Sequence, residues 1–455
     1  MKKKLFIVIL SLFSVFNSFS EEYFLTVVFN DSNNSKNRDF FAKAVQTNGF
    51  YLKERFVPIT LSQPKVKLPE MAYVYDIRVE SNNIDEFVRE LKESGYFEYV
   101  LLHELVSTNC GNPHPPLNDE RIVNGTYSCY HLDLINARCA WSITTGNPNI
   151  IIGIVDSDFE LTHEDLENQI VYISGTVSGD PHGTRVASAA AAETNNGKGI
   201  AGIGYNSKIA AYRVGSNFPL SFQLRDAIWA AYLDNRRIIN VSFSGTGLTP
   251  REAETITRSG TTLTLSAGNT ATSLQHELIA DIPGVINVSS VSSDNNYYTG
   301  HARNQYVDLC APGRNIAVAT TGNGYTIAHG TSYAAPMVAG TVALMLSVSP
   351  SLSPAGIETI LKNTAAPINN AHLYPGLIGA GRLDAYAAVQ KAQCSADLFS
   401  AFGEIITTNR TVTSCSDINV YNVYIQSGKL TLDAAETTRI IRNFEVALGA
   451  ELEIR

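Results

Sequence analysis

Apolar residues in the middle of the chain gather in short, nearly continuous runs, separated by stretches with helical spacing. Continuous apolar runs are typical of strands that are buried on both faces, as in a parallel sheet with helices on each side. The pattern over residues 121–393 therefore predicts an α/β fold with a doubly wound, mainly parallel sheet. The expected strands are residues 150–155, 209–214, 238–241, 261–266 and 285–291, and the expected helices are 182–192, 220–235 and 332–348.

Residues 23–106 have a different pattern and form a domain of their own. Their apolar positions predict the order strand, helix, strand, strand, helix, strand, which matches a split βαβ, ferredoxin-like α+β unit. This fold by itself carries no particular function. The expected strands are residues 24–30, 51–60, 72–79 and 96–105, and the expected helices are 38–47 and 83–94.

Residues 108–120 contain the run Gly111-Asn-Pro-His-Pro-Pro116. Proline at this density, with a glycine before it, predicts an exposed linker, and such a linker is a place where a protease would cut. His114, alone between prolines, is expected to be a solvated linker residue rather than a ligand.

Residues 394–455 are rich in Thr, Val, Ile and Asn, and apolar and polar positions alternate at 420–425, 429–433 and 439–444. Alternation of this kind predicts a small all-β appendage of about three to six strands. No repeat of long period is visible there or elsewhere in the sequence.

Composition and charge narrow the class of protein. The chain has 455 residues, of which 44% are hydrophobic and 17% charged, which is typical of a globular protein with a large core. The formal net charge is -9. Because no basic stripe is present to neutralise phosphates, nucleic acid is not an expected partner.

The first twenty residues predict export. Lys2, Lys3 and Lys4 precede an apolar run over residues 5–16, and Ser18 and Ser20 then place small residues two apart. Residues 1–20 therefore fit a secretory signal peptide that is cleaved after Ser20. The apolar run is too short to span a membrane, and no other stretch is long enough. We expect a secreted protein, extracellular or at the cell surface, without a transmembrane span.

Export makes the six cysteines candidates for disulfides, although six cysteines allow 15 pairings. Cys394 and Cys415 flank one short segment that a bridge could staple. Cys310 ends an apolar run and is expected to be a buried thiol. One pair is plausible in the remaining cluster, which comprises Cys110, Cys129 and Cys139. None of the six cysteines has the spacing of a zinc-binding or redox motif.

A helix that is apolar nearly all round follows Gly330, and Ser332 lies in its first turn. Such a helix must be buried, so its start presents a hydroxyl and the positive end of the helix dipole at the rim of a core. We place Pro336 in the first turn as well, where its missing N–H costs little. Ser332 alone would be interpreted as a helix cap.

Three further polar residues stand at the ends of predicted elements. Asp156 ends an apolar strand, His182 begins a helix, and Asn269 follows another strand. Each alone has a simpler interpretation, as a helix cap, a surface group and a turn residue respectively. Because ligands bind outside the carboxyl ends of parallel strands, the three are expected to meet Ser332 at one edge of the sheet.

Together the four residues suit nucleophilic catalysis. Ser332 needs a base to remove its proton, and His182 is the natural one. Asp156 would hold the imidazole in the productive tautomer and stabilise its charged form. Asn269 and a backbone N–H at the start of the helix would bind an oxyanion.

At this point the sequence resembles the subtilisin-like serine proteases. Asp156-Ser-Asp, His182-Gly-Thr, Ser266-Ala-Gly-Asn269 and Gly330-Thr-Ser332-Tyr-Ala-Ala-Pro look like the motifs of that family, and the spacings of 26, 87 and 63 residues are similar. The resemblance covers residues 120–393. It implies a subtilisin-like fold and a secreted serine endopeptidase in which Asp156, His182 and Ser332 are catalytic.

The resemblance also bears on the rest of the chain. It implies that residues 21–107 are a propeptide that inhibits the enzyme and assists its folding before it is cut away. Proteins or peptides are the implied substrates, and the chemistry needs no cofactor. Structural calcium is common in the family, but no loop in this sequence has a ligand spacing that places it.

By the same resemblance, Ser242, Phe243 and Ser244 pair with the backbone of the substrate as an added strand. The other implied substrate-binding residues are Ser266, Ala267 and Gly268.

Two departures from the family pattern stand near these positions. Asp158 and Ser244 each replace a usual glycine. We expect Asp158 to point to solvent, although a second carboxylate could instead raise the pKa of Asp156 or of His182. The Ser244 side chain could narrow the cleft.

One alternative stays open and one is excluded. Asp158, Ser244 and the β-rich appendage also suit a catalytically inactive binding or adhesion protein with the same fold. An esterase of the α/β-hydrolase class is excluded, because that class needs a Gly-x-Ser-x-Gly elbow and the order Ser, Asp, His.

Overall fold

The computed structural model describes residues 117–454 except 124, 216–219, 415–416 and 436, and four strands nearer the N-terminus. The chain divides into two compact units, residues 1–109 and 110–455. The predicted signal peptide, the helices expected at 38–47 and 83–94, and most of the predicted linker lie outside the described residues.

The first unit contains a four-stranded antiparallel sheet. Its strands are β1 (Glu22–Phe29), β2 (Leu52–Glu54), β3 (Val74–Glu80) and β4 (Phe97–His103). The strand order is β2-β3-β1-β4, so β3 lies between β1 and β2. This is the arrangement that a split βαβ unit requires.

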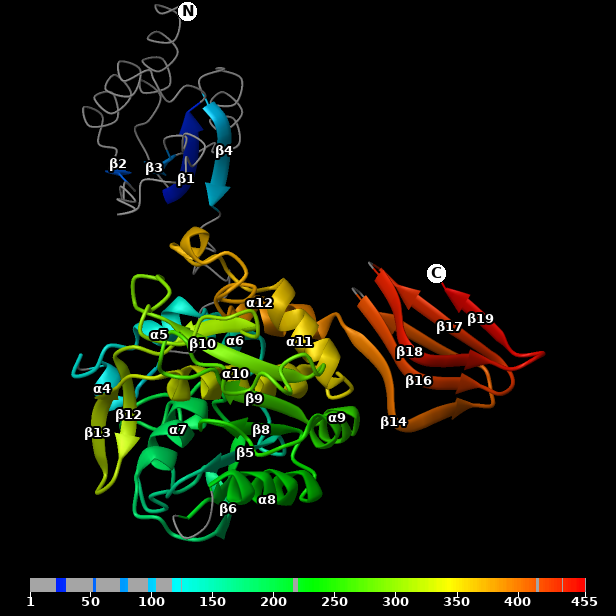
Figure 1. The fold of residues 1–455 in the computed structure, drawn as a ribbon, viewed down its shortest axis with the longest axis horizontal. Coiled ribbons are helices and arrows are strands. Elements are labelled where there is room, and N and C mark those ends of the chain that lie inside the picture. The colour runs from blue at the N-terminus through cyan, green and yellow to red at the C-terminus, as the bar shows by residue number, and fades with distance from the viewer. Residues whose placement is uncertain are drawn as a thin grey trace, which may run out of the picture. The chain divides into compact units, whose positions relative to one another are not determined.

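A seven-stranded parallel sheet forms the centre of the second unit, which confirms the predicted α/β fold (Figure 1). Its order is β11-β10-β9-β8-β5-β7-β6, and every neighbouring pair is parallel. The strands are β5 (Ile151–Asp156), β6 (Ile170–Gly175), β7 (Lys208–Arg213), β8 (Ile238–Val241), β9 (Thr262–Ser266), β10 (Val285–Val291) and β11 (Leu309–Pro312). All five predicted strands are present. The two edge strands were not among them: β6 is only partly buried, and β11 has only four residues.

Helices cover both faces of this sheet. One core cluster joins the sheet to α7 (His182–Ala191), α10 (Thr331–Val348) and α12 (Ala385–Gln393). A second cluster joins its other face to α8 (Leu220–Leu233) and α9 (Pro250–Arg258). Ile154 belongs to the first cluster and Val155 to the second, as expected for a strand buried on both faces. The remaining helices are α4 (Glu120–Val123), α5 (Tyr130–Leu134), α6 (Ala137–Ile143), α11 (Pro354–Asn363) and the 3-10 turn η1 (Ala371–Leu373).

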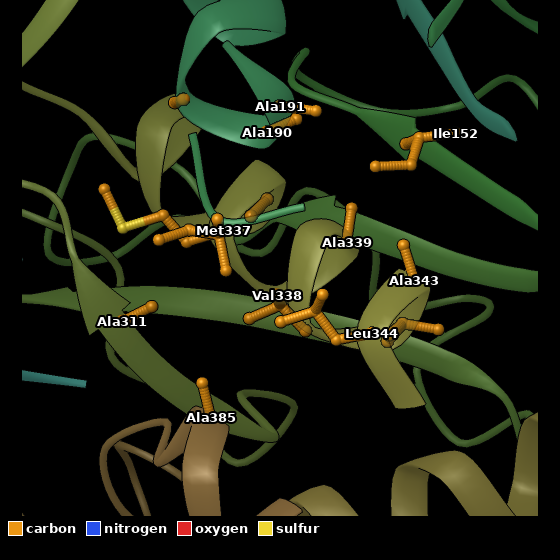
Figure 2. Packing of buried hydrophobic residues seen from close by; sticks show 14 of the residues in the cluster. Ile152, Ala190, Ala191, Ala311, Met337, Val338, Ala339, Ala343, Leu344 and Ala385 are labelled. Carbon is orange, nitrogen blue, oxygen red and sulfur yellow. The ribbon is translucent and has the colours of Figure 1, made fainter. Parts of the chain in front are cut away.

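The helix α10 is buried along almost its whole length. It is long and apolar enough to cross a membrane, so the expectation that no stretch beyond the first twenty residues has such a length was wrong. Since 89% of it is buried, it is typical of the core helix of a folded domain. Figure 2 shows Val338, Ala339 and Ala343 of this helix among other small and apolar side chains. A Cβ at Gly340 would lie 2.6 Å from the Ala190 carbonyl oxygen, so α7 and α10 approach each other through glycine.

The predicted position of Pro336 within its helix was wrong. The structure places it inside α10 and not in the first turn. The proline therefore removes a backbone N–H that would have donated to the carbonyl of Ser332, four residues earlier.

The hairpin of β12 (Ile316–Thr320) and β13 (Gly324–Ala328) leads into α10. Gly330 follows with φ 150°, a conformation open mainly to glycine, and the helix begins at the next residue. The sharp turn predicted at this glycine is present.

The C-terminal region contains six strands in two three-stranded parallel sheets, with the orders β14-β16-β18 and β15-β17-β19. They are β14 (Ala396–Ile406), β15 (Arg410–Ser414), β16 (Asp417–Ile425), β17 (Lys429–Ala434), β18 (Thr437–Val446) and β19 (Glu451–Ile454). The chain passes alternately from one sheet to the other, as in a β-solenoid.

The strands of this region repeat at a nearly constant offset, although no repeat of long period is visible in the sequence. Ala396 pairs with Ile418, and Ile418 pairs with Thr438, so the offsets are 418−396 = 22 and 438−418 = 20 residues. The repeat lies in the backbone. Its paired residues share no motif that a reading of the sequence would find.

Of the cysteines, Cys310 is a buried free thiol, as predicted. Cys139 and Cys394 are disulfide-bonded, and Cys129 is a free thiol.

Candidate functional site

The candidate site lies where the carboxyl ends of β5, β8 and β9 meet the start of α10. Asp156 is the last residue of β5, Ser242 follows β8 directly, and Asn269 lies three residues beyond β9. Because these strands are parallel neighbours, their carboxyl ends lie at one edge of the sheet.

Asp156 and His182 form a hydrogen-bonded pair in which the carboxylate is buried and the imidazole half-buried. The Nδ1 atom of His182 lies 2.7 Å from Oδ1 of Asp156, and the Asp156 side chain has no exposed surface. The same Oδ1 accepts hydrogen bonds from the backbone N–H of Ser157 at 2.7 Å and from its hydroxyl at 3.2 Å. Since the carboxylate fixes the proton on Nδ1, Nε2 of the neutral imidazole is an acceptor.

The surroundings of His182 raise its pKa. Burial of the ring lowers the pKa, but the Asp156 carboxylate raises it through its charge and its hydrogen bond, and Asp180 adds a second negative charge. The charge of Arg185 opposes them, and the pKa lies above its ordinary value of 6.5. Asp180 also accepts a hydrogen bond from the backbone N–H of His182 through its side chain, at 3.1 Å.

Ser332 and Ser242 exchange two hydrogen bonds. The Ser332 hydroxyl donates to the carbonyl of Ser242 at 3.3 Å, and the Ser242 hydroxyl donates to the carbonyl of Ser332 at 2.9 Å. The carbonyl of Ser332 can accept this bond because Pro336, four residues later, has no N–H to donate to it. The proline inside the helix therefore leaves room for a bond that ties the segment after β8 to the start of α10.

Two aromatic rings place His182 beside these serines. The ring of Phe243, next to Ser242, has its centroid 6.1 Å from that of His182. The ring of Tyr333, next to Ser332, lies 5.9 Å away. The imidazole is therefore held by both segments that carry the serines.

The side chain of Asn269 has a defined orientation. Its Oδ1 accepts hydrogen bonds from the backbone N–H of Thr331 at 2.8 Å and from the Thr331 hydroxyl at 3.1 Å. The Nδ2 group is therefore directed away from Thr331, and the residue is exposed. An amide in this setting can donate to a charge that develops beside the first N–H groups of α10.

The remaining predicted substrate-binding residues lie beside this edge. The Thr331 hydroxyl accepts a hydrogen bond from the N–H of Gly268 at 3.1 Å, and Ser266 is buried. Ala267 packs in a small core cluster with Ala302 and Val307, so only its backbone can serve a ligand. Ser244 is exposed.

The prediction that Asp158 points to solvent is wrong. Its carboxylate forms an ion pair with Arg213 at 2.8 Å, and only 18% of its side chain is exposed. The charges that shift the pKa of His182 are those of Asp156, Asp180 and Arg185. Asp158 is therefore a local ion-pair partner at the ends of β5 and β7.

Two polar residues near the pair, Ser157 and Asp180, were not among the predicted site residues. Ser157 links Asp156 to the loop before α7, because its hydroxyl also donates to the Asp180 carbonyl at 2.9 Å. Both residues lie within two positions of a motif residue, and that proximity was the available signal.

Two buried carboxylates elsewhere have the character of a cation site. Asp119 and Asp165 have no exposed surface, and neither forms an ion pair within the described part of the chain. Oδ2 of Asp119 is buried and has no hydrogen-bond partner. In the described end of the predicted linker Asp119 is thus buried, whereas Asn118 and Glu120 are exposed as predicted. No group of three or more His, Cys, Asp or Glu that could hold a metal occurs among the described residues.

The loop after α7 contacts both carboxylates through N–H donors. Asn195 donates its backbone N–H to Asp119 at 2.8 Å, and the Asn196 side-chain amide donates to Asp165 at 3.2 Å. A hard cation such as Ca²⁺ takes carboxylate and carbonyl oxygens as ligands. The unpartnered Oδ2 of Asp119 is the observation that fits a cation ligand.

Comparisons with known proteins agree with this geometry. Residues 147–396 match the model of the Subtilase family. An extracellular protease of Xanthomonas campestris pv. campestris is 36% identical over 240 residues, which are 46% of this chain and 40% of the relative. A thermophilic serine proteinase of Bacillus sp. strain AK1 is 32% identical over 263 residues, 55% of this chain and 64% of the relative.

The solved structures add evidence on the fold alone. The crystal structure of a lanthipeptide protease aligns with a TM-score of 0.50 at 21% identity, over 60% of this chain and 98% of that one. The chain spans between 40% and 64% of the length of the two relatives above.

Replacing Asp180 by Asn is expected to lower the pKa of His182. The change removes a negative charge that stabilises the imidazolium, while Asn keeps an oxygen for the His182 N–H. A pH titration of the His182 ring by NMR measures the shift. Because Asp180 is exposed, the difference between wild type and variant shrinks at high salt.

Asp226→Asn is the matched control for this titration, since its carboxylate is 72% exposed and lies on α8. It should leave the His182 titration unchanged. An unchanged or raised His182 pKa in Asp180→Asn would contradict the electrostatic account.

Proposed function

Because the chain belongs to the subtilase family, we propose that it is a serine endopeptidase that hydrolyses peptide bonds through an acyl-enzyme. The observation that carries the proposal is the hydrogen bond between the buried Asp156 carboxylate and His182, whose ring lies against Phe243 and Tyr333 beside Ser332. The Xanthomonas relative is named an extracellular protease and the Bacillus relative a serine proteinase.

An extended peptide first binds along Ser242–Ser244. Phe243 is half-buried and Ser244 is exposed, so this segment offers its backbone to an added strand. The carbonyl of Ser242 bonds to the Ser332 hydroxyl in the structure. Rotation about the Cα–Cβ bond of Ser332 brings that hydroxyl from this carbonyl toward Nε2 of His182.

His182 then acts as the general base. Its Nε2 takes the hydroxyl proton while Oγ of Ser332 forms a bond to the carbonyl carbon. The imidazolium that results is stabilised by the Asp156 carboxylate at 2.7 Å. The proton passes next to the amine that leaves as the peptide C–N bond breaks, and the acyl-enzyme remains.

Asn269 and the start of α10 stabilise the tetrahedral oxyanion. Because Oδ1 of Asn269 is held by Thr331, its Nδ2 donates to the negative oxygen together with the Ser332 N–H. Water then attacks the acyl-enzyme with His182 again as base, and Ser332 recovers its proton.

The N-terminal segments fit a secreted precursor. We assign residues 1–20 as a signal peptide and residues 21–107 as an inhibitory propeptide that is cut away after folding. The sheet order of the first unit and the name of the Xanthomonas relative as an extracellular protease support this assignment.

The inactive binding protein is the weaker alternative. Asp158, one of its motivations, is bound to Arg213 and does not disturb the Asp156–His182 pair.

We further propose that Asp119 and Asp165 hold a structural calcium ion with oxygen atoms of residues 195–200. Its positive charge would compensate two buried carboxylates and tie residues 117–123 to the loop after α7. It takes no part in the peptide chemistry.

Ser332→Ala is expected to lower kcat by about 10⁶, the size known for the equivalent loss in subtilisin, a member of this family. The precursor should also stay whole in the variant, while wild type loses its N-terminal segment. Intact mass over time and hydrolysis of a peptide substrate give the two readouts.

Ser347→Ala, in the same helix, is the control and should process like wild type. Full activity of Ser332→Ala would refute the proposal. Failure of folded wild type to react with a serine-directed phosphonate would replace it with the inactive binding protein.

Asn269→Asp is expected to lower kcat by about 10²–10³, again the magnitude known from subtilisin, with KM nearly unchanged. Asp keeps the oxygen that binds Thr331 but loses the amide donor and adds a negative charge beside the oxyanion. Steady-state kinetics with a peptide substrate measure both constants. A rise in KM at constant kcat would show that Asn269 binds the ground state instead.

Removal of calcium is expected to lower the melting temperature of wild type. A ligand present at 100 times its Kd stabilises the native state by about 2.7 kcal/mol. Calorimetry in excess calcium and in chelator gives the difference. Asp165→Asn should reduce that difference, whereas Asp226→Asn should keep it. Equal melting temperatures of wild type in both buffers would refute the calcium site.

A further inference from the structure

Gln275 bridges two segments that border the candidate site. Its Nε2 donates to the hydroxyl of Ser244 at 3.0 Å. A Cβ at Gly268 would lie 3.0 Å from Cδ of Gln275, so the same side chain rests on the segment after β9. The amide therefore spans the distance between the segment after β8 and the segment after β9.

The backbone on both sides of Gln275 is anchored. The carbonyl of Ser273 accepts a hydrogen bond from the Asn304 side chain at 2.6 Å. Nε2 of His276 donates to the carbonyl of Ser266 at 3.0 Å, and this ring is 6% exposed. The backbone beside Gln275 is therefore anchored on both sides of this residue.

Burial keeps the His276 anchor neutral at ordinary pH. Desolvation lowers the pKa of His276 to about 4, although the bond to Ser266 works in the opposite direction. The ring therefore adds no charge beside the candidate site across the neutral pH range.

The position of Gln275 has a consequence for the substrate. In the proposed mechanism the scissile carbonyl lies between Ser332 and Asn269, and the peptide extends along Ser242–Ser244. The side chain of the residue that supplies this carbonyl then enters between the two segments. Gln275 already occupies that space.

We propose that Gln275, held by Ser244, sets the specificity of this site for a small side chain on the residue before the scissile bond. The inference rests on the proposed peptidase function. A small side chain fits beside the amide, whereas a large one must break the bond to Ser244 and displace it. Ser244 stands where the family usually has glycine, and its hydroxyl accepts the hydrogen bond that holds Gln275 in this position.

The test compares two peptide p-nitroanilides that differ only in the last residue, Ala or Phe. Wild type should cleave the Ala substrate with the higher kcat/KM. Gln275→Ala should raise the ratio of kcat/KM for Phe over Ala by about tenfold or more, within the range that a change of pocket size produces. Ser244→Ala, which removes only the hydrogen bond, should shift the ratio in the same direction by less.

Thr272→Ala, an exposed change in the same loop, is the control and should leave the ratio unchanged. Each protein is first titrated with a serine-directed phosphonate, so that rates refer to active sites. If both wild type and Gln275→Ala react with the phosphonate but have the same Phe/Ala ratio of kcat/KM, this inference is overturned. The proposed peptidase function would then still stand. Absence of labelling in folded wild type would overturn the peptidase function itself.

Discussion

A carboxylate without contact with solvent stands at the end of β5, and the site is built around its charge. Such a charge is costly unless donors satisfy it. Asp156 receives three hydrogen bonds at Oδ1, two from Ser157 and one from His182. The bond that offsets the burial of the carboxylate also fixes the imidazole with Nε2 as an acceptor. The stability of the buried charge and the basicity of the histidine thus have one origin.

The start of α10 depends on a second local arrangement. Pro336 leaves the Ser332 carbonyl without its helical partner, and the Ser242 hydroxyl occupies that carbonyl at 2.9 Å. The segment after β8 is thereby tied to the helix, and Gly340 lets the helix lie against α7. The missing hydrogen bond at Pro336 and the close packing at Gly340 thus both hold the helix that carries the serine.

The strands that could be predicted from the sequence are the fully buried ones at the centre of the sheet. The five central strands were predictable because strands buried on both faces must be apolar along their whole length. The partly exposed edge strand β6 lacks that signal. The stacking of β16 on β14 and β18 was missed because parallel pairing is made by backbone groups, which leave no required side chain at offsets of 20 or 22 residues.

The sequence by itself determined which side chains stand at strand ends and helix starts. Since parallel strands share one edge for their carboxyl ends, it also determined that Asp156, Asn269 and Ser332 lie near one another. Only the tertiary structure decided which partner each polar group takes: Arg213 for Asp158, Ser244 for Gln275, and Ser242 for the carbonyl that Pro336 leaves open. The physical reason is that these partners come from segments far apart in the chain. Their distances depend on how whole elements pack, and the local pattern of residues carries no measure of that.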